Sequence, residues 1–151
     1  MTYSSKQMFE ITGETKQRIQ YWVLKGLLQP VDIGRGVGTS RRYSESNLLE
    51  IMLAQALAPI LNNIDFIKRI LDEIKDIKPS FFAMSDEKDR IDEDECILTV
   101  LYLSDNDIMF NVHSLEEAKE WISKYLPSGF KSFQMDLNVL KRTLIERIDT
   151  I

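Results

Sequence analysis

The side chains best suited to chemistry are hydrogen-bond donors, and they gather in two stretches near the N-terminus. The first stretch contains Lys16, Gln17, Arg18, Gln20 and Tyr21, and the second contains Arg35, Arg41, Arg42 and Tyr43. Guanidinium groups form forked hydrogen bonds with phosphate oxygens, and amides can read the edges of bases. These residue types therefore predict contacts with a nucleic acid, provided that the fold presents them on one surface.

A short helix is predicted just before the first stretch. Ser4 and Gln7 have the spacing of a capping box, in which the serine hydroxyl accepts a backbone N–H and the glutamine reaches back to the cap. Gly13 can take the positive φ that a tight turn requires. The sequence therefore predicts a helix that begins near Ser5 and ends at Gly13.

The first stretch is itself predicted to be a helix over residues 16–25, capped by Thr15 and ended by Gly26. Helical spacing places three apolar residues on its buried face: Ile19, Trp22 and Val23. We expect Trp22 to be a core residue, whereas the hydroxyl of Tyr21 can reach a phosphate. Two helices joined by so short a turn form a helix-turn-helix, whose second helix can enter the major groove of DNA.

The second stretch is predicted to be a wing. Residues 30–43 have the pattern of an edge strand, a basic loop over residues 34–40 with three alternate glycines, and a return strand ending at Tyr43. An arginine on such a loop can contact a phosphate or enter a minor groove. Because Arg41 and Arg42 alternate along the strand, we expect only one of them to face DNA.

Two longer helices are predicted after the wing. Ser44 is suited to cap a helix over residues 45–58. Its expected buried face consists of Leu48, Leu49, Met52, Leu53, Ala56 and Leu57. Residues 63–78 then form an amphipathic helix. Its expected apolar face consists of Ile64, Ile67, Ile70, Leu71, Ile74 and Ile77.

Five short motifs in this order resemble the winged-helix DNA-binding domain of MerR-family regulators. They are residues 11–15, the pair Tyr21-Trp22, residues 26–30, residues 41–44 and the apolar helix that follows. The resemblance implies a recognition helix in the major groove, a wing on the flanking backbone and a homodimer on a palindrome. It also implies that Lys16, Gln17, Arg18 and Tyr21 face DNA, with Arg35, Arg41 and Arg42 on the wing. Partners that follow from it are RNA polymerase and a small-molecule effector.

Two features depart from the family pattern. Gln20 stands where many members carry arginine, so a charged backbone contact is missing and a lower affinity is expected. The far end of the chain shows no long coiled-coil helix of the kind that many relatives use to dimerise. The expected dimer therefore rests on the resemblance alone.

The remaining sequence predicts a second, smaller unit of α and β structure. Residues 85–95 are almost wholly charged and are expected to be a linker, after an apolar trio of Phe81, Phe82 and Met84 that should dock on a domain or on a partner subunit. Residues 96–112 have the pattern of a β-hairpin. A helix capped by Ser114 and Glu117, a strand over residues 130–135 and a final helix follow, with Leu137, Leu140, Leu144 and Ile148 as its stripe.

The predicted fold is therefore α+β, with an N-terminal winged helix-turn-helix followed by a ββαβα unit. We divide the chain into a DNA-binding domain with its exit helix at residues 1–78, a linker at 79–95 and a dimerisation or effector unit at 96–151. Residues 1–57 contain seven Lys/Arg and five Asp/Glu, whereas the remainder contains twelve and nineteen. The net charge of −5 thus belongs to the second half, and a modestly basic first half can still bind phosphates.

Several other classes of protein are disfavoured by the sequence. No apolar run approaches the length of about 18 residues that a membrane helix needs. Cys96 is the single cysteine, and together with a polar N-terminus it favours the cytoplasm. His113 and Cys96 lack partners at metal-ligand spacing, and residues 34–38 lack the context of a phosphate-binding loop. We therefore expect no metal, no cofactor and no enzyme.

The leading hypothesis is a transcription regulator that binds a palindromic promoter site on double-stranded DNA as a homodimer. Two alternatives stay open. One is an excisionase-like or phage-borne factor that bends DNA. Head-to-tail repeats in the target would favour this alternative. The other is a protein-interaction adaptor whose winged helix no longer binds DNA, which the acidic net charge and Gln20 would suit.

Overall fold

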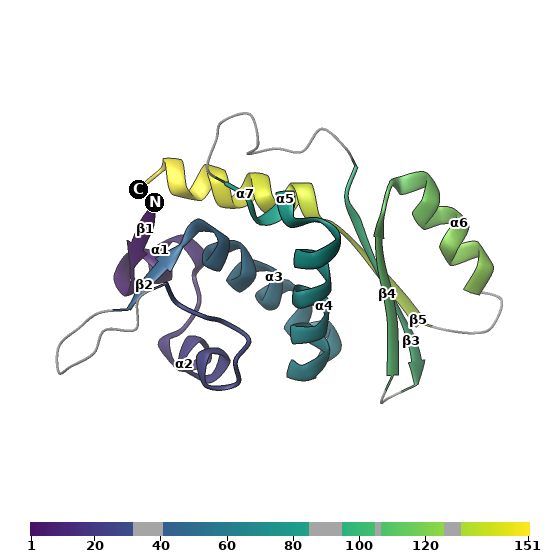
Figure 1. Cartoon of the computed structure of the whole chain (residues 1–151), viewed down its shortest axis with the longest axis horizontal. Coiled ribbons are helices and arrows are strands. Elements are labelled where there is room, and N and C mark those ends of the chain that lie inside the picture. Colours follow the sequence, from purple (N-terminus) through teal and green to yellow (C-terminus); the bar gives the residue numbers. More distant parts are fainter. Residues whose placement is uncertain (32–40, 85–94, 105–106, 126–130) are drawn as a thin grey trace. The chain divides into compact units, whose positions relative to one another are not determined.

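The computed structural model of the chain describes residues 1–31, 41–84, 95–104, 107–125 and 131–151 (Figure 1). It divides into two compact units: unit 1 comprises residues 1–90 and 140–151, and unit 2 comprises residues 91–139. This division differs from the one expected from sequence, because most of the last helix belongs to the N-terminal unit. The expected functional boundaries, with a linker and an effector unit, stay predictions.

Unit 1 is mostly helical. Its elements are β1 (Thr2–Ser4), α1 (Ser5–Thr12), α2 (Lys16–Leu24), β2 (Arg42–Ser44), α3 (Glu45–Leu61), α4 (Ile64–Ile77), α5 (Pro79–Phe82) and most of α7 (Leu137–Asp149). The helices enclose a core whose side chains are less than about a tenth exposed, among them Met8, Ile19, Leu48, Leu53 and Ile70.

The predicted helix ends of the helix-turn-helix are confirmed. Ser4 Oγ accepts the backbone N–H of Gln7 at 3.3 Å, and the glutamine Oε1 accepts the Ser4 N–H at 3.0 Å, which completes the capping box. Gly13 ends α1 with a φ of 70°, and Thr15 Oγ1 caps α2 by accepting the Arg18 N–H at 3.3 Å. Gly26 follows α2 with a φ of 71°.

The strand β1 was not predicted. It pairs antiparallel with β2, with Tyr3 opposite Tyr43, and both tyrosines are buried. Each strand ends in a serine, Ser4 or Ser44, that caps the following helix through a capping box. The repeated order of tyrosine, capping serine and helix was therefore the signal for this ribbon, but at three residues each strand is too short to show a period of two.

The helix α3 is longer than predicted. It continues through Pro59 to Leu61 and ends at Asn62, whose φ is 44°. Proline already has a helical φ. Because it has no N–H, the helix loses one hydrogen bond, the one to the carbonyl four residues before the proline. Pro59 lies in the last turn, and the Asn62 N–H closes the helix by donating to the Ala58 carbonyl at 3.1 Å.

The next helix and the apolar trio largely follow the prediction. Helix α4 buries Ile67, Ile70, Leu71 and Ile74. Ile77, which was expected on the same face, is 52% exposed because it is the last residue of the helix. The trio is buried within unit 1, with Phe81 and Phe82 in the short helix α5 and Met84 just after it.

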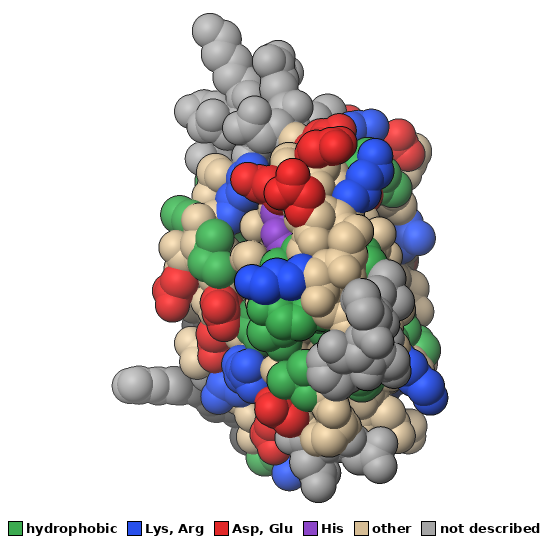
Figure 2. All heavy atoms as spheres, turned by 90° about the vertical axis from the view of Figure 1, so that its right-hand side faces the viewer, with side chains coloured by type: hydrophobic (Ala, Val, Ile, Leu, Met, Phe, Trp, Pro, Cys, Tyr) green, Lys and Arg blue, Asp and Glu red, His purple; other side chains and the backbone are tan. Residues whose placement is uncertain are grey.

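Unit 2 contains an antiparallel sheet in the strand order β4-β3-β5. Its elements are β3 (Ile97–Ser104), β4 (Asp107–His113), α6 (Leu115–Tyr125) and β5 (Lys131–Asp136), and α6 packs against β4 and β3. The predicted order ββαβα is thus confirmed, as is the Ser114–Glu117 capping box of α6. Figure 2 shows a face on which Lys/Arg and Asp/Glu side chains are interspersed among hydrophobic ones.

Three predictions fall outside the described residues. These are the wing loop at 34–40 with Arg35, most of the charged linker at 85–95, and the start of the third strand at Phe130. The mixed α and β class is observed, whereas the wing stays a prediction. None of the described helices combines the length and the apolar character needed to cross a membrane.

Candidate nucleic-acid interface

The outward face of α2 is polar at its start and apolar at its end. Lys16, Gln17 and Gln20 are exposed, as predicted. Tyr21 is 47% exposed and Leu24 is 83% exposed. Leu24 was missed because a leucine near a helix end is normally assigned to the core, although its position seven residues after Gln17 puts both on one face. Sequence spacing could therefore have found it.

Part of this face adjoins the segment that leads into β2. A hollow of about 330 Å³ is lined by Lys16, Ile19 and Gln20 of α2, by Ser5 and Phe9 of α1, and by Arg41 and Tyr43. Lys16, Gln20 and Arg41 were all predicted to contact DNA, and the fold brings them to one place although more than twenty residues separate the two segments. The hollow thus joins the predicted recognition helix to the base of the predicted wing.

Arg18 is engaged within the protein. Its Nη1 lies 3.5 Å from Oε2 of Glu14, and its guanidinium carbon lies 5.0 Å from the ring centroid of Trp22. The Glu14 carboxylate is buried and also accepts the backbone N–H of Thr15 at 2.9 Å. The negative charge therefore sits at the N-terminus of α2, where the helix dipole favours it, and Arg18 partly neutralises it. Less of the Arg18 charge is left for a phosphate than the sequence suggested.

Two aromatic residues of the predicted site region are core residues. Trp22 is 3% exposed, which confirms the prediction for it. Tyr43 is 2% exposed and lies opposite Tyr3 in the β1-β2 ribbon. Its expected contact with DNA is not supported by this burial, because alternation along β2 turns its side chain inward. We leave Tyr43 out of the proposed interface.

The two arginines before Tyr43 differ in exposure. Arg42 is exposed in β2, whereas Arg41 is half-buried beside the hollow. The carbonyl of Arg42 accepts the Val31 N–H at 3.0 Å, so the chain entering the predicted wing runs beside β2. This contact places the two ends of the predicted loop together.

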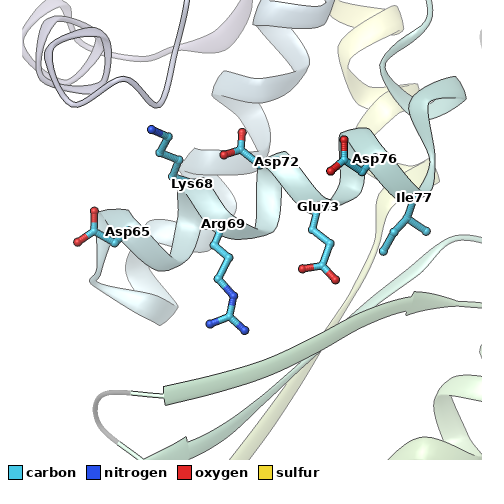
Figure 3. A pocket seen from close by; sticks show the side chains of 7 residues that line it. All are labelled: Asp65, Lys68, Arg69, Asp72, Glu73, Asp76 and Ile77. Atoms are coloured by element: carbon cyan, nitrogen blue, oxygen red, sulfur yellow. The ribbon is translucent and has the colours of Figure 1, made fainter.

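A second hollow, of about 630 Å³, lies along α4 but lacks convergent groups (Figure 3). It is lined by Asp65, Lys68, Arg69, Asp72, Glu73, Asp76 and Ile77. The side chains fan outward from one helix, and the acidic groups outnumber the basic ones. Such a face would repel phosphates, and we interpret it as a solvated helix surface.

A metal site would need several of the remaining titratable groups to lie close together. Within the described ranges, no three His, Cys, Asp or Glu side chains lie close enough to hold a metal ion. Burial lowers the pKa of His113, whose ring packs edge-on against Trp121 with 5.2 Å between centroids. Cys96, the single cysteine of the chain, is buried. Both residues belong to the packing of unit 2.

The comparison with known families agrees with the geometry of unit 1. Residues 3–74 match the family described as MerR HTH family regulatory protein. The match runs from β1 to the last turn of α4 and includes both helices of the helix-turn-helix. No curated protein matches the chain significantly. The N-terminal part of this chain is therefore a MerR-family helix-turn-helix domain, the DNA-binding domain of a class of transcriptional regulators.

Proposed function

We propose that the chain is a sequence-specific transcription regulator that binds a palindromic promoter site as a homodimer. The observation that carries the proposal is the hollow at which Lys16 and Gln20 of the recognition helix meet Arg41. Two cations and an exposed amide that share one hollow are expected where phosphates position a helix and base edges are read beside them.

The proposed contacts follow from exposure and charge. Lys16, Arg41 and Arg42 would neutralise phosphates, and Gln17 and Gln20 would donate to and accept from base edges. Tyr21 would reach the backbone through its hydroxyl. Arg18 would contribute less than the others, because its guanidinium already pairs with Glu14 at 3.5 Å. Arg35 on the predicted wing is a further proposed contact.

Unit 2 lies outside the family match, and we propose that it serves assembly or the sensing of an effector. By the family resemblance, the regulator would change how RNA polymerase engages the promoter.

The test is the selection of bound duplexes from a random pool, followed by affinity measurements across salt concentrations. The informative variant is Lys16→Glu with Arg41→Glu, and the matched control is Lys119→Glu with Lys124→Glu on the exposed side of α6. Each lost phosphate contact lowers the slope of log K against log salt by about 0.9, so the first variant should lose about two units and the control none. Arg18→Glu is avoided because it would disturb Glu14.

The selected sequence separates the alternatives. A palindrome bound by two chains, with half-site centres about 34 Å or a multiple apart, supports the homodimeric regulator. Head-to-tail repeats favour an architectural factor. If no duplex is enriched at low salt, the proposal fails, and the exposed Tyr21 and Leu24 on α2 then favour an adaptor that docks a protein.

A further inference from the structure

The C-terminal helix reaches the turn of the helix-turn-helix. Arg147 of α7 donates from Nη1 to the carbonyl of Ile11 at 3.2 Å and to that of Thr12 at 3.4 Å. These carbonyls belong to the last turn of α1, where no helical N–H is left to pair with them. A cation is favoured there by the helix dipole, and α1 has no basic residue in its own last turn. Arg147 supplies that charge from the far end of the chain.

The same turn is held by several further bonds. Gln55 of α3 donates from Nε2 to the Thr12 carbonyl at 3.1 Å. The Thr12 hydroxyl accepts the Glu14 N–H at 3.3 Å, and the Gly13 N–H bonds the Phe9 carbonyl at 2.9 Å. Residues 13–15 connect α1 to α2, so their backbone angles set the direction of the recognition helix. Arg147 therefore bonds the end of α1 from which this connecting segment starts.

Helix α7 is a firm support for this contact. Leu144, one turn before Arg147, is fully buried. Lys141, one turn earlier, is 1% exposed and donates from Nζ to the carbonyls of Ser80 at 3.2 Å and Ala83 at 3.1 Å. Hydrogen bonds from a charged donor are stronger than neutral ones, so α7 is fixed to unit 1 over consecutive turns.

The other end of α7 belongs to unit 2. The helix follows β5 directly, and the N–H of its first residue, Leu137, bonds the Cys96 carbonyl at 2.9 Å. Residues 137–139 are assigned to unit 2 and residues 140–151 to unit 1. Helix α7, yellow in Figure 1, thus has its first residues in unit 2 and the rest in unit 1. The family match ends at residue 74, so Arg147 lies outside it.

We propose that Arg147 is a positioning residue for DNA binding, which holds the turn between α1 and α2 and thereby ties the direction of the recognition helix to α7. The proposal rests on the proposed function and deepens it. It makes unit 2 a part that can act on DNA binding without touching DNA, because any shift of α7 moves or releases the Arg147 contact.

The experiment compares Arg147→Ala and Arg147→Lys with Arg142→Ala in the full-length protein. Arg142 lies on the same helix and is exposed, as Arg147 itself is, but no hydrogen bond or ion pair joins its side chain to another described residue. Hydrogen exchange over residues 8–20 is measured first, in the absence of DNA. Loss of bonds from a charged donor should speed exchange at residues 13–18 by about tenfold in Arg147→Ala. Arg142→Ala should match the wild type, and Arg147→Lys should lie between.

Affinity for the selected duplex is then measured across salt. If Arg147 positions α2, Arg147→Ala weakens binding by about tenfold with an unchanged salt slope, whereas loss of a phosphate contact would lower the slope by about 0.9. A lowered slope overturns the proposal, and so does equal exchange in Arg147→Ala and Arg142→Ala. Faster exchange spread evenly over unit 1 would mean a general structural role and overturns it too.

The two proposals fail in different ways. A wild-type protein that binds no duplex overturns the proposed function, and with it the role of Arg147 in DNA binding. The exchange measurement needs no DNA, so it still decides whether Arg147 holds the turn.

Discussion

Replacing Lys75 by methionine should destabilise unit 1, because it leaves a buried carboxylate without its cation. Glu50 of α3 has a side chain only 7% exposed, and its Oε1 lies 2.9 Å from Nζ of Lys75 on α4. Its Oε2 accepts a hydrogen bond from Asn47 Nδ2 at 3.2 Å. In Lys75→Met the carboxylate keeps the amide but loses its cation. Methionine preserves the apolar stem, which otherwise would add a packing loss.

The magnitude follows from how far the pair is screened by water. Breaking a fully buried ion pair costs about 3–5 kcal/mol, whereas an exposed pair contributes about 1 kcal/mol or less. The Lys75 side chain is 38% exposed, so the pair lies between these limits. We expect a loss of about 2 kcal/mol in the free energy of unfolding. For a chain of this length that corresponds to a fall of about 4–8 °C in Tm.

The assay is urea unfolding followed by helical circular dichroism, with Lys68→Met on the same helix as the matched control. A double-mutant cycle with Glu50→Gln isolates the pair, and its coupling energy should be about 1–2 kcal/mol. Lys68→Met should change stability by less than about 0.5 kcal/mol, as is usual for surface substitutions. A loss in Lys75→Met no larger than that of the control would refute the reasoning, because it would mean that water or Asn47 already satisfies the carboxylate.

Three further predictions concern pH, the tight turn and the coupling of the units. Burial lowers the pKa of His113 below its ordinary 6.5, so the unfolded chain binds the proton more readily and stability should fall as pH drops below about 6.5. Urea unfolding from pH 7 to 5 should show this fall in stability in the wild type and a smaller fall in His113→Gln. Glu117 titrates below this pH range, because its hydrogen bonds to Ser114 lower its pKa. Gly13→Ala should lower the free energy of unfolding by about 1–2 kcal/mol, because an L side chain is strained at φ 70°. Thermal unfolding measures this loss, and the control Gly13→Asn should lose less. Leu98→Ala should loosen unit 2 and speed hydrogen exchange at residues 13–18, but not in an Arg147→Ala background; equal effects in both backgrounds would contradict coupling through α7.

Local signals predicted most of unit 1 and the element order of unit 2. Capping serines and threonines act through bonds that span three residues, so Ser4, Thr15 and Ser44 mark helix starts in the sequence itself. Gly13 marks a helix end because this signal depends only on the positive φ of one residue. Apolar periodicity found α4 because four of its residues share one buried face.

Contacts between distant segments could not be predicted in this way. Nothing near Lys141 in the sequence indicates that it is buried, since its acceptors lie about sixty positions away. The Arg147 contact with the α1 carbonyls joins residues 135 or 136 positions apart. Tyr43 was misplaced for a related reason: its inward direction is set by pairing with Tyr3, in a strand that the sequence did not reveal.

The number of cations in the proposed interface bears on the proposed homodimer. Four cations are proposed to contact phosphates: Lys16, Arg41 and Arg42, which are at least partly accessible, and Arg35 on the predicted wing. Four phosphate contacts would cost about 10²-fold in affinity between 50 and 200 mM salt, and eight would cost about 10⁴-fold. The larger figure is typical of specific binders that make 6–10 contacts. Four proposed contacts in one subunit are fewer than such binders make, and two subunits on a palindrome would supply eight. A monomer bound to a single half-site with a slope near −7 would contradict this, because four contacts could not account for it.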